Sequence, residues 1–131
     1  MKNDYTNQTK QHTVEELALT AAKRVEEGWN MFQSKNNRYV TRSVDNTVPM
    51  ETQFFLWSLI DAQVQNSNNL DYFQKFELKA TAKGQMILHS QEVPQWSQVT
   101  VMAVPSECCI TETIWVIDSG DYQTMLFPED Y

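Results

Sequence analysis

The last 48 residues of this 131-residue chain contain no lysine or arginine. Residues 1–83 contain ten basic and ten acidic side chains, whereas residues 84–131 contain seven acidic ones, so the whole net charge of −7 lies in the second stretch. Proteins that bind nucleic acids need clustered basic side chains to contact the phosphates. The sequence therefore predicts no direct nucleic-acid binding, and it favours a protein with a basic surface as the partner.

Cysteine and glycine are also scarce. The two cysteines, Cys108 and Cys109, are adjacent and there is no second pair, which excludes a zinc framework and a Cys-x-x-Cys redox motif. The three glycines, Gly28, Gly84 and Gly120, are scattered, so the chain has no glycine-rich loop that would bind a phosphate. We therefore expect no cofactor and no metal.

Long apolar runs are missing as well. No run approaches the roughly 20 residues of a membrane-spanning helix. Residues 1–11 are polar and lack the apolar segment of a signal peptide. We therefore expect a cytoplasmic protein that does not associate with a membrane.

The N-terminal residues contain one amphipathic pattern. Thr13 and Glu16 fit a capping box, and Gly28 suits the end of the helix that would follow. The apolar side chains at helical spacing are Val14, Leu17, Ala18, Ala21 and Val25. We predict an extension with one helix over residues 1–30 and a single domain over residues 31–131. The thin apolar face of this helix would pack either on the domain or on a second copy, as a homo-oligomer.

The strongest helical pattern spans residues 48–65. Pro49 suits the first turn, and Glu51 places a negative charge at the positive end of the helix dipole. Apolar side chains fill most of the circumference, more than the stripe of about 100° that a surface helix needs. We predict a core helix covered on two sides. Phe54 projects near the polar sector, which makes it a candidate for contact with a partner.

The rest of the domain alternates between strand patterns and short turns. The predicted strands span residues 38–44, 72–78, 85–91, 99–104, 109–117 and 122–127. Short connections favour antiparallel neighbours. The predicted fold class is α+β, with a curled antiparallel sheet of about five to six strands packed on the central helix and an added N-terminal helix. The apolar run at 99–104 is expected to be buried in the middle of the sheet.

Few residues suggest catalysis. The one cluster with acid–base character consists of His89, Gln91 and Glu92, in which strand alternation puts His89 and Gln91 on one face and Glu92 on the other. A single histidine on a strand is more often a hydrogen-bonded structural residue than a catalyst. An enzyme using His89 with a nearby carboxylate is therefore the alternative to a binding protein.

The acidic residues supply the other candidates. Asp118 and Asp121 flank a tight turn but lack the number of ligands of a calcium loop. Glu112 lies in a predicted strand, so its exposure depends on which face of the sheet is in contact with solvent. Together with Phe54, these three acids form the candidate binding residues. We predict a non-enzymatic protein-binding module, of which an acidic inhibitor or nucleic-acid mimic is one form.

Several motifs between residues 32 and 131 point to a known family. They include Arg38-Tyr39-Val40-Thr41-Arg42, Val48-Pro49, Phe55-Leu56-Trp57, Asp71-Tyr72-Phe73-Gln74, Phe76-Glu77-Leu78 and Gly120-Asp121. With these motifs the chain resembles the domain of unknown function 960, a family of uncharacterised small proteins of Gram-positive bacteria and their mobile elements. The resemblance supports the domain limits and implies no activity, cofactor or catalytic residue.

Overall fold

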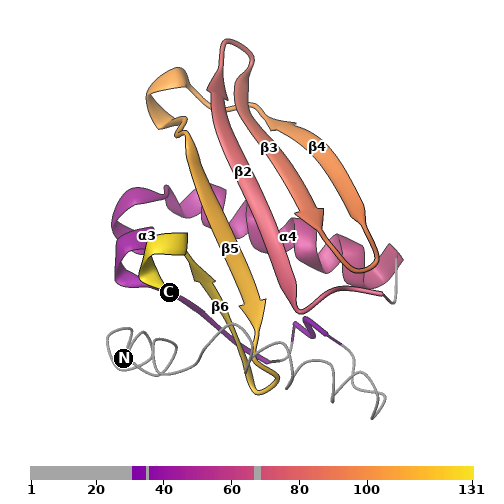
Figure 1. The fold of residues 1–131 in the computed structure, drawn as a ribbon. Helices are drawn as coiled ribbons and strands as arrows, with labels where there is room; N and C mark the ends of the chain where they lie inside the picture. The colour runs from indigo at the N-terminus through magenta and orange to yellow at the C-terminus, as the bar shows by residue number, and fades with distance from the viewer. Residues whose placement is uncertain (1–30, 35, 67–68) are drawn as a thin grey trace.

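The computed structural model describes residues 31–34, 36–66 and 69–131, so the predicted N-terminal helix and the extension over residues 1–30 lie outside the described residues. Within this part, one sheet of six strands and one long helix form an α+β fold (Figure 1). The elements in chain order are β1 (Asn37–Val40), α3 (Arg42–Thr47), α4 (Met50–Asn66), β2 (Phe73–Thr81), β3 (Gly84–Gln91), β4 (Trp96–Met102), the short 3₁₀ turn η1 (Ser106–Cys108), β5 (Glu112–Asp118), β6 (Tyr122–Leu126) and the 3₁₀ turn η2 (Pro128–Asp130).

The sheet is mixed, with the strand order β1-β6-β5-β2-β3-β4. The pairs β2–β3, β3–β4, β2–β5 and β5–β6 are antiparallel, as short connections predict. The pair β1–β6 is parallel, so the prediction of a wholly antiparallel sheet is wrong at this edge. Almost the whole domain separates β1 from β6 along the chain, and loop length therefore gives no information on their relative direction.

The first predicted strand changes into a helix. β1 ends at Val40, and Thr41 caps α3, since its hydroxyl accepts a hydrogen bond from the Val44 backbone N–H at 3.4 Å. The prediction of a strand over residues 38–44 is thus wrong beyond Val40. A threonine can satisfy a free N–H group at the first turn of a helix, and this local hydrogen bond competes with strand pairing.

α4 packs behind the sheet and covers one of its faces (Figure 1). The helix residues that face the sheet are Thr52, Gln53, Leu56, Trp57 and Ile60, all buried. Phe54, which the helical spacing places near the polar sector, is 65% exposed. Phe55, Leu59 and Val64 are partly buried against the core, and cover on a second side of the helix stays a prediction. No helix among the described residues is long and apolar enough to cross a membrane.

The apolar run at residues 99–104 is not central. It belongs largely to β4, which forms an edge of the sheet and has β3 as its neighbour. Val99 is 60% exposed and Val101 50% exposed. The prediction of a buried central strand is therefore wrong. An apolar run indicates a strand, but it does not indicate whether other strands flank it on both sides.

Candidate functional site

The face of the sheet opposite α4 has no α-helix over it in the described part of the chain (Figure 1). Residues directly opposite each other on antiparallel strands point to the same face. Two rows of paired residues cross this open face: Thr113, Glu77, Leu88 and Val99 form one, and Lys79, Met86 and Val101 form the other. The open face therefore combines charged and apolar side chains at its surface.

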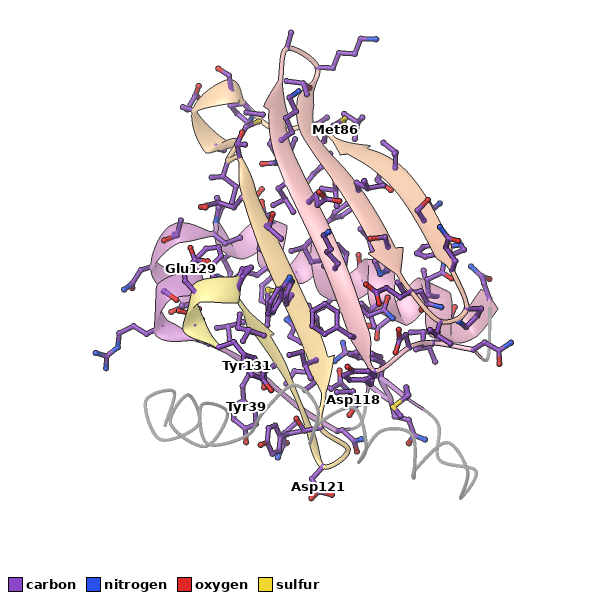
Figure 2. All side chains as sticks on the ribbon, in the orientation of Figure 1. Tyr39, Met86, Asp118, Asp121, Glu129 and Tyr131 are labelled. Atoms are coloured by element: carbon purple, nitrogen blue, oxygen red, sulfur yellow. The ribbon has the colours of Figure 1, made fainter. Side chains whose placement is uncertain are left out.

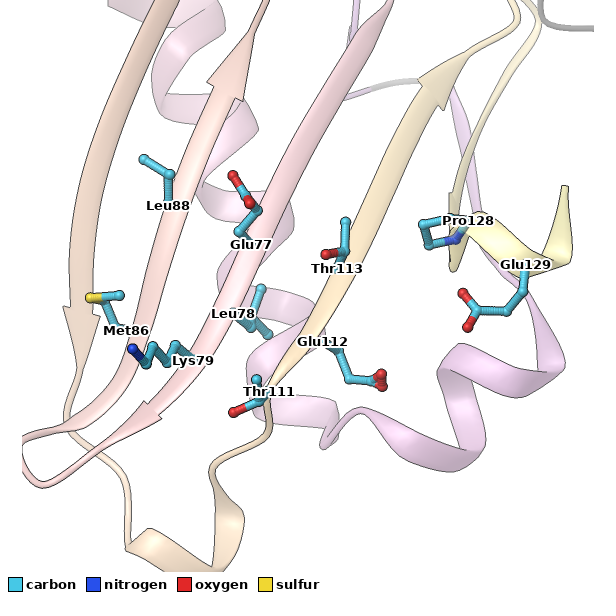
Figure 3. A pocket seen from close by; sticks show the side chains of 10 residues that line it. All are labelled: Glu77, Leu78, Lys79, Met86, Leu88, Thr111, Glu112, Thr113, Pro128 and Glu129. Atoms are coloured by element: carbon cyan, nitrogen blue, oxygen red, sulfur yellow. The ribbon is translucent and has the colours of Figure 1, made fainter.

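A groove of about 650 Å³ extends from this face, at β2 and β3, past the start of β5 to the C-terminal turn η2 (Figure 3). We call it the acidic groove. Its charged lining residues are Glu77, Lys79, Glu112 and Glu129, three carboxylates and one ammonium group, which leave a formal net charge of −2. Met86 and Leu88 are among its apolar lining residues. Glu112 pairs with the buried Leu78, so it belongs to the other face of the sheet at the start of β5. A groove with this lining complements a ligand that has both cationic and apolar groups.

The carboxylates of the groove differ in how strongly they are held. The Glu77 carboxylate lies 3.9 Å from the Lys75 ammonium group, and both side chains are nearly half exposed, so this ion pair is weak. In the described residues, neither Glu112 nor Glu129 has a side-chain hydrogen bond or an ion pair. These two carboxylates can therefore bind a cation without first giving up an internal partner.

The four candidate binding residues do not form one site. Glu112 lines the acidic groove at the start of β5, whereas Asp118 ends the same strand, roughly 20 Å away at about 3.3 Å per residue. Asp121 lies in the turn beyond it, at the end of the molecule far from Met86 (Figure 2). Phe54 is on α4, behind the sheet. Only Glu112 of this set contributes to the groove.

Asp118 has a structural position. It is 2% exposed, and its carboxylate accepts hydrogen bonds from the backbone N–H groups of Phe32 and Gly120, each at 2.7 Å. Phe32 has a φ of 57°, a conformation that is unfavourable for a bulky residue. Asp118 thus fixes an unfavourable backbone segment against the β5–β6 turn, and it is not accessible to a partner. Turn acids are usually solvated, which is why its sequence position indicated a surface residue.

His89 is also buried, with 2% exposure. Its Nε2 lies 2.7 Å from the Gln74 Oε1, its ring stacks on Phe76 at 4.3 Å, and the edge of Trp96 meets it at 4.8 Å. The amide nitrogen of Gln74 donates to the Gln91 Oε1 at 2.9 Å, so its oxygen faces His89. Neutral His89 therefore donates from Nε2. Burial lowers the pKa of His89 to about 4.

This environment does not suit acid–base catalysis by His89. A catalytic base must reach its substrate, and it works best with a pKa near the working pH. Glu92 is exposed in the β3–β4 turn, and among the described residues no hydrogen bond joins it to His89. Asp71 adjoins the Gln74–Gln91 network, since its backbone N–H donates to the Gln91 Oε1 at 3.0 Å. The Asp71 carboxylate accepts from the Val93 N–H at 3.2 Å, and burial raises its pKa. The network stabilises a turn.

Sequence reasoning missed a set of buried amides. Gln74, Gln85 and Gln123 are fully buried on the inner face of the sheet, where each amide binds backbone or side-chain groups. Each of them alternates with its strand neighbours in the way that core residues do, and this alternation was the available signal. Buried amides are uncommon, so a glutamine is not expected at a core position even where the alternation of the strand indicates one.

No metal centre is present in the part of the chain that the structure describes, where no group of three or more histidine, cysteine or acidic side chains is arranged to hold an ion. Cys108 is exposed and Cys109 is partly buried, and both thiols are free. The Cys109 sulfur lies 3.5 Å from the Pro105 carbonyl oxygen.

Comparison with known proteins identifies the family. The model of a family described as staphylococcal protein of unknown function (DUF960) matches residues 37–130. The chain belongs to this family. A crystal structure of a protein of unknown function from Enterococcus faecalis is similar over 79% of this chain and 97% of that chain, with a TM-score of 0.70 and 21% identity. At this identity the likeness shows the fold alone. No protein of curated function matches the chain.

Proposed function

We propose that this DUF960 protein is a non-enzymatic protein-binding module. Its acidic groove receives a partner segment that contains lysine or arginine together with apolar side chains. The observation that carries the proposal is the acidic groove itself, which three carboxylates line together with the apolar side chains of Met86 and Leu88. Apolar contact supplies affinity, and the carboxylates select for basic segments and against acidic ones.

The charge of the whole chain supports the same choice of partner. A net charge of −7 attracts a basic protein over a distance and accelerates encounter. Glu112 and Glu129 have no internal partners among the described residues, so they act at the rim of the groove. Rim charges mainly change association rates, and their effect falls with salt because the Debye length is about 8 Å at physiological ionic strength.

An acidic mimic of nucleic acid is a narrower form of this proposal, with the basic groove of a nucleic-acid enzyme as the partner. It has less support. Of the seven acids in residues 84–131, Asp118 is buried, and Asp130 accepts hydrogen bonds from the hydroxyls of Thr41 and Ser43 at 2.7 and 2.6 Å. Fewer carboxylates are therefore available to imitate a row of phosphates.

The test compares two double variants that remove the same charge. Glu112→Gln with Glu129→Gln neutralises the groove, and Glu107→Gln with Asp121→Asn neutralises two exposed acids that do not line it. A partner is isolated from the native host with the parent protein, and association rates are measured over a range of salt. We expect the groove variant to bind about tenfold more slowly or more weakly at low salt, and the control to change by about twofold.

A direct map of the contact makes the result independent of net charge. An amide NMR titration with a peptide of alternating lysine and leucine should shift the signals of Met86, Leu88 and Thr113 before those of α4. Equal loss of binding in both double variants, or shifts confined to the helix side, would contradict the groove as the binding site.

A further inference from the structure

β4 is an edge strand of the sheet, and its own sequence lacks the features that usually block pairing. Its sequence, Trp-Ser-Gln-Val-Thr-Val-Met, contains no charged residue and no proline. Each residue of β4 pairs with one residue of β3, from Trp96 opposite Gln91 to Met102 opposite Gln85. The pairing therefore contains no bulge. Edge strands are usually blocked by a lysine, a proline, a bulge or short length, because alternate N–H and C=O groups point outward and can pair with another strand. β4 has no lysine, proline or bulge, and its seven residues do not make it a short strand.

The side chains of β4 favour pairing as well. Val99 and Val101 are at least half exposed, and both lie on the open face of the sheet. β-branched side chains pack well against cross-strand neighbours, so they favour the addition of a further strand here. The other edge of the sheet differs, since β1 has only four residues, Asn37–Val40, and includes Arg38.

We propose that β4 pairs with β4 of a second copy of this chain. The two strands run antiparallel about a twofold axis at Val99, and the two sheets become continuous. In this register Val99 lies opposite itself, Ser97 opposite Val101, Gln98 opposite Thr100, and Trp96 opposite Met102. Odd positions meet odd positions, so both copies keep their open faces on the same side.

Charge points to a second copy in this orientation. Two chains of net charge −7 repel each other, and a contact between them requires a neutral surface, which β4 provides. Glu92 lies in the turn just before β4, and Lys83 lies in the β2–β3 turn next to the end of β4 at Met102. Antiparallel pairing brings Glu92 of one copy to the same end as Lys83 of the other. Parallel pairing would place the two Glu92 carboxylates together.

The inference does not depend on the acidic groove, because it concerns backbone pairing at the edge of the sheet and no residue of β4 lines the groove. The test uses the full chain and measures its mass by sedimentation equilibrium across protein concentration. We expect the parent to approach twice the 15.3 kDa of one chain as concentration rises. Val99→Lys should weaken this dimer about tenfold or more, because identical charges would face each other across the twofold axis.

Two further samples separate edge pairing from other contacts. Phe54→Lys adds the same charge at a 65% exposed helix position and should leave the dimer unchanged. An equimolar mixture of Val99→Lys and Val99→Glu should recover the mass of the dimer, because opposite charges then meet across the strands. Circular dichroism confirms that each variant is folded.

Three results would overturn the proposal. The first is a parent that stays monomeric at all concentrations. The second is a dimer that Val99→Lys weakens no more than Phe54→Lys does. The third is a mixture of the two Val99 variants that remains monomeric although the parent is a dimer.

Discussion

The buried His89 should make the stability of this protein depend on pH in a defined window. In the unfolded chain a histidine titrates near pH 6.5, whereas burial in the fold lowers the pKa of His89 to about 4. Between these values the unfolded chain binds the proton and the folded protein does not. Stability from this group is therefore complete above pH 6.5 and falls as pH is lowered towards 4.

The size of the effect follows from the shift. A difference of about 2.5 pKa units at about 1.36 kcal/mol each gives roughly 3 kcal/mol of unfolding free energy between pH 7 and pH 4. The figure needs no large correction for solvent, because His89 is 2% exposed. Its Nε2 already donates to Gln74 at 2.7 Å, so the added proton must go to Nδ1, which makes no hydrogen bond among the described residues.

The measurement is urea unfolding followed by tryptophan fluorescence from pH 4 to pH 7, on the parent and on His89→Gln. Acidic groups titrate in both proteins, and the difference between the two curves removes their contribution. We expect the parent to gain roughly 3 kcal/mol over the variant as pH rises to 6.5, with no further gain above it. A difference that stays constant from pH 4 to 7 would show that His89 has the same pKa in the folded and unfolded protein, as a solvated histidine does, and would refute its assignment to the core.

Three further predictions concern packing and the domain limits. Trp57→Ala should lower the unfolding free energy by about 3–5 kcal/mol, since its side chain is 9% exposed against the sheet, and a melting temperature near that of the parent would contradict the packing of α4. Asp118→Asn should cost roughly 1–3 kcal/mol in thermal unfolding, because the charged acceptor for the Phe32 N–H is lost, whereas Asp121→Asn in the same turn should change little. Removal of residues 1–28 should leave a domain that unfolds cooperatively, because the described core begins at Met31. Loss of the cooperative transition would refute this boundary, and a change in oligomer mass alone would assign the segment to self-association.

Local patterns in the sequence determined several elements. The helical spacing of residues 48–65 predicted α4 within about two residues at each end. The glycine at position 120 and the flanking aspartates predicted the β5–β6 turn, where the Ser119 N–H bonds the Tyr122 carbonyl at 2.9 Å. Both features depend on residues that are close together in the sequence, and the sequence alone is therefore enough to predict them.

The tertiary structure alone decided where these elements lie and what their residues do. Asp118 is buried because it bonds Phe32, 86 residues away along the chain. Arg38 binds Asp61 of α4, and its guanidinium group lies 4.8 Å from the centre of the Trp57 ring. The place of β4 at an edge and the burial of His89 follow from the order of the strands. Strand order depends on contacts between distant segments, and a local pattern is the same whether a strand is central or at an edge.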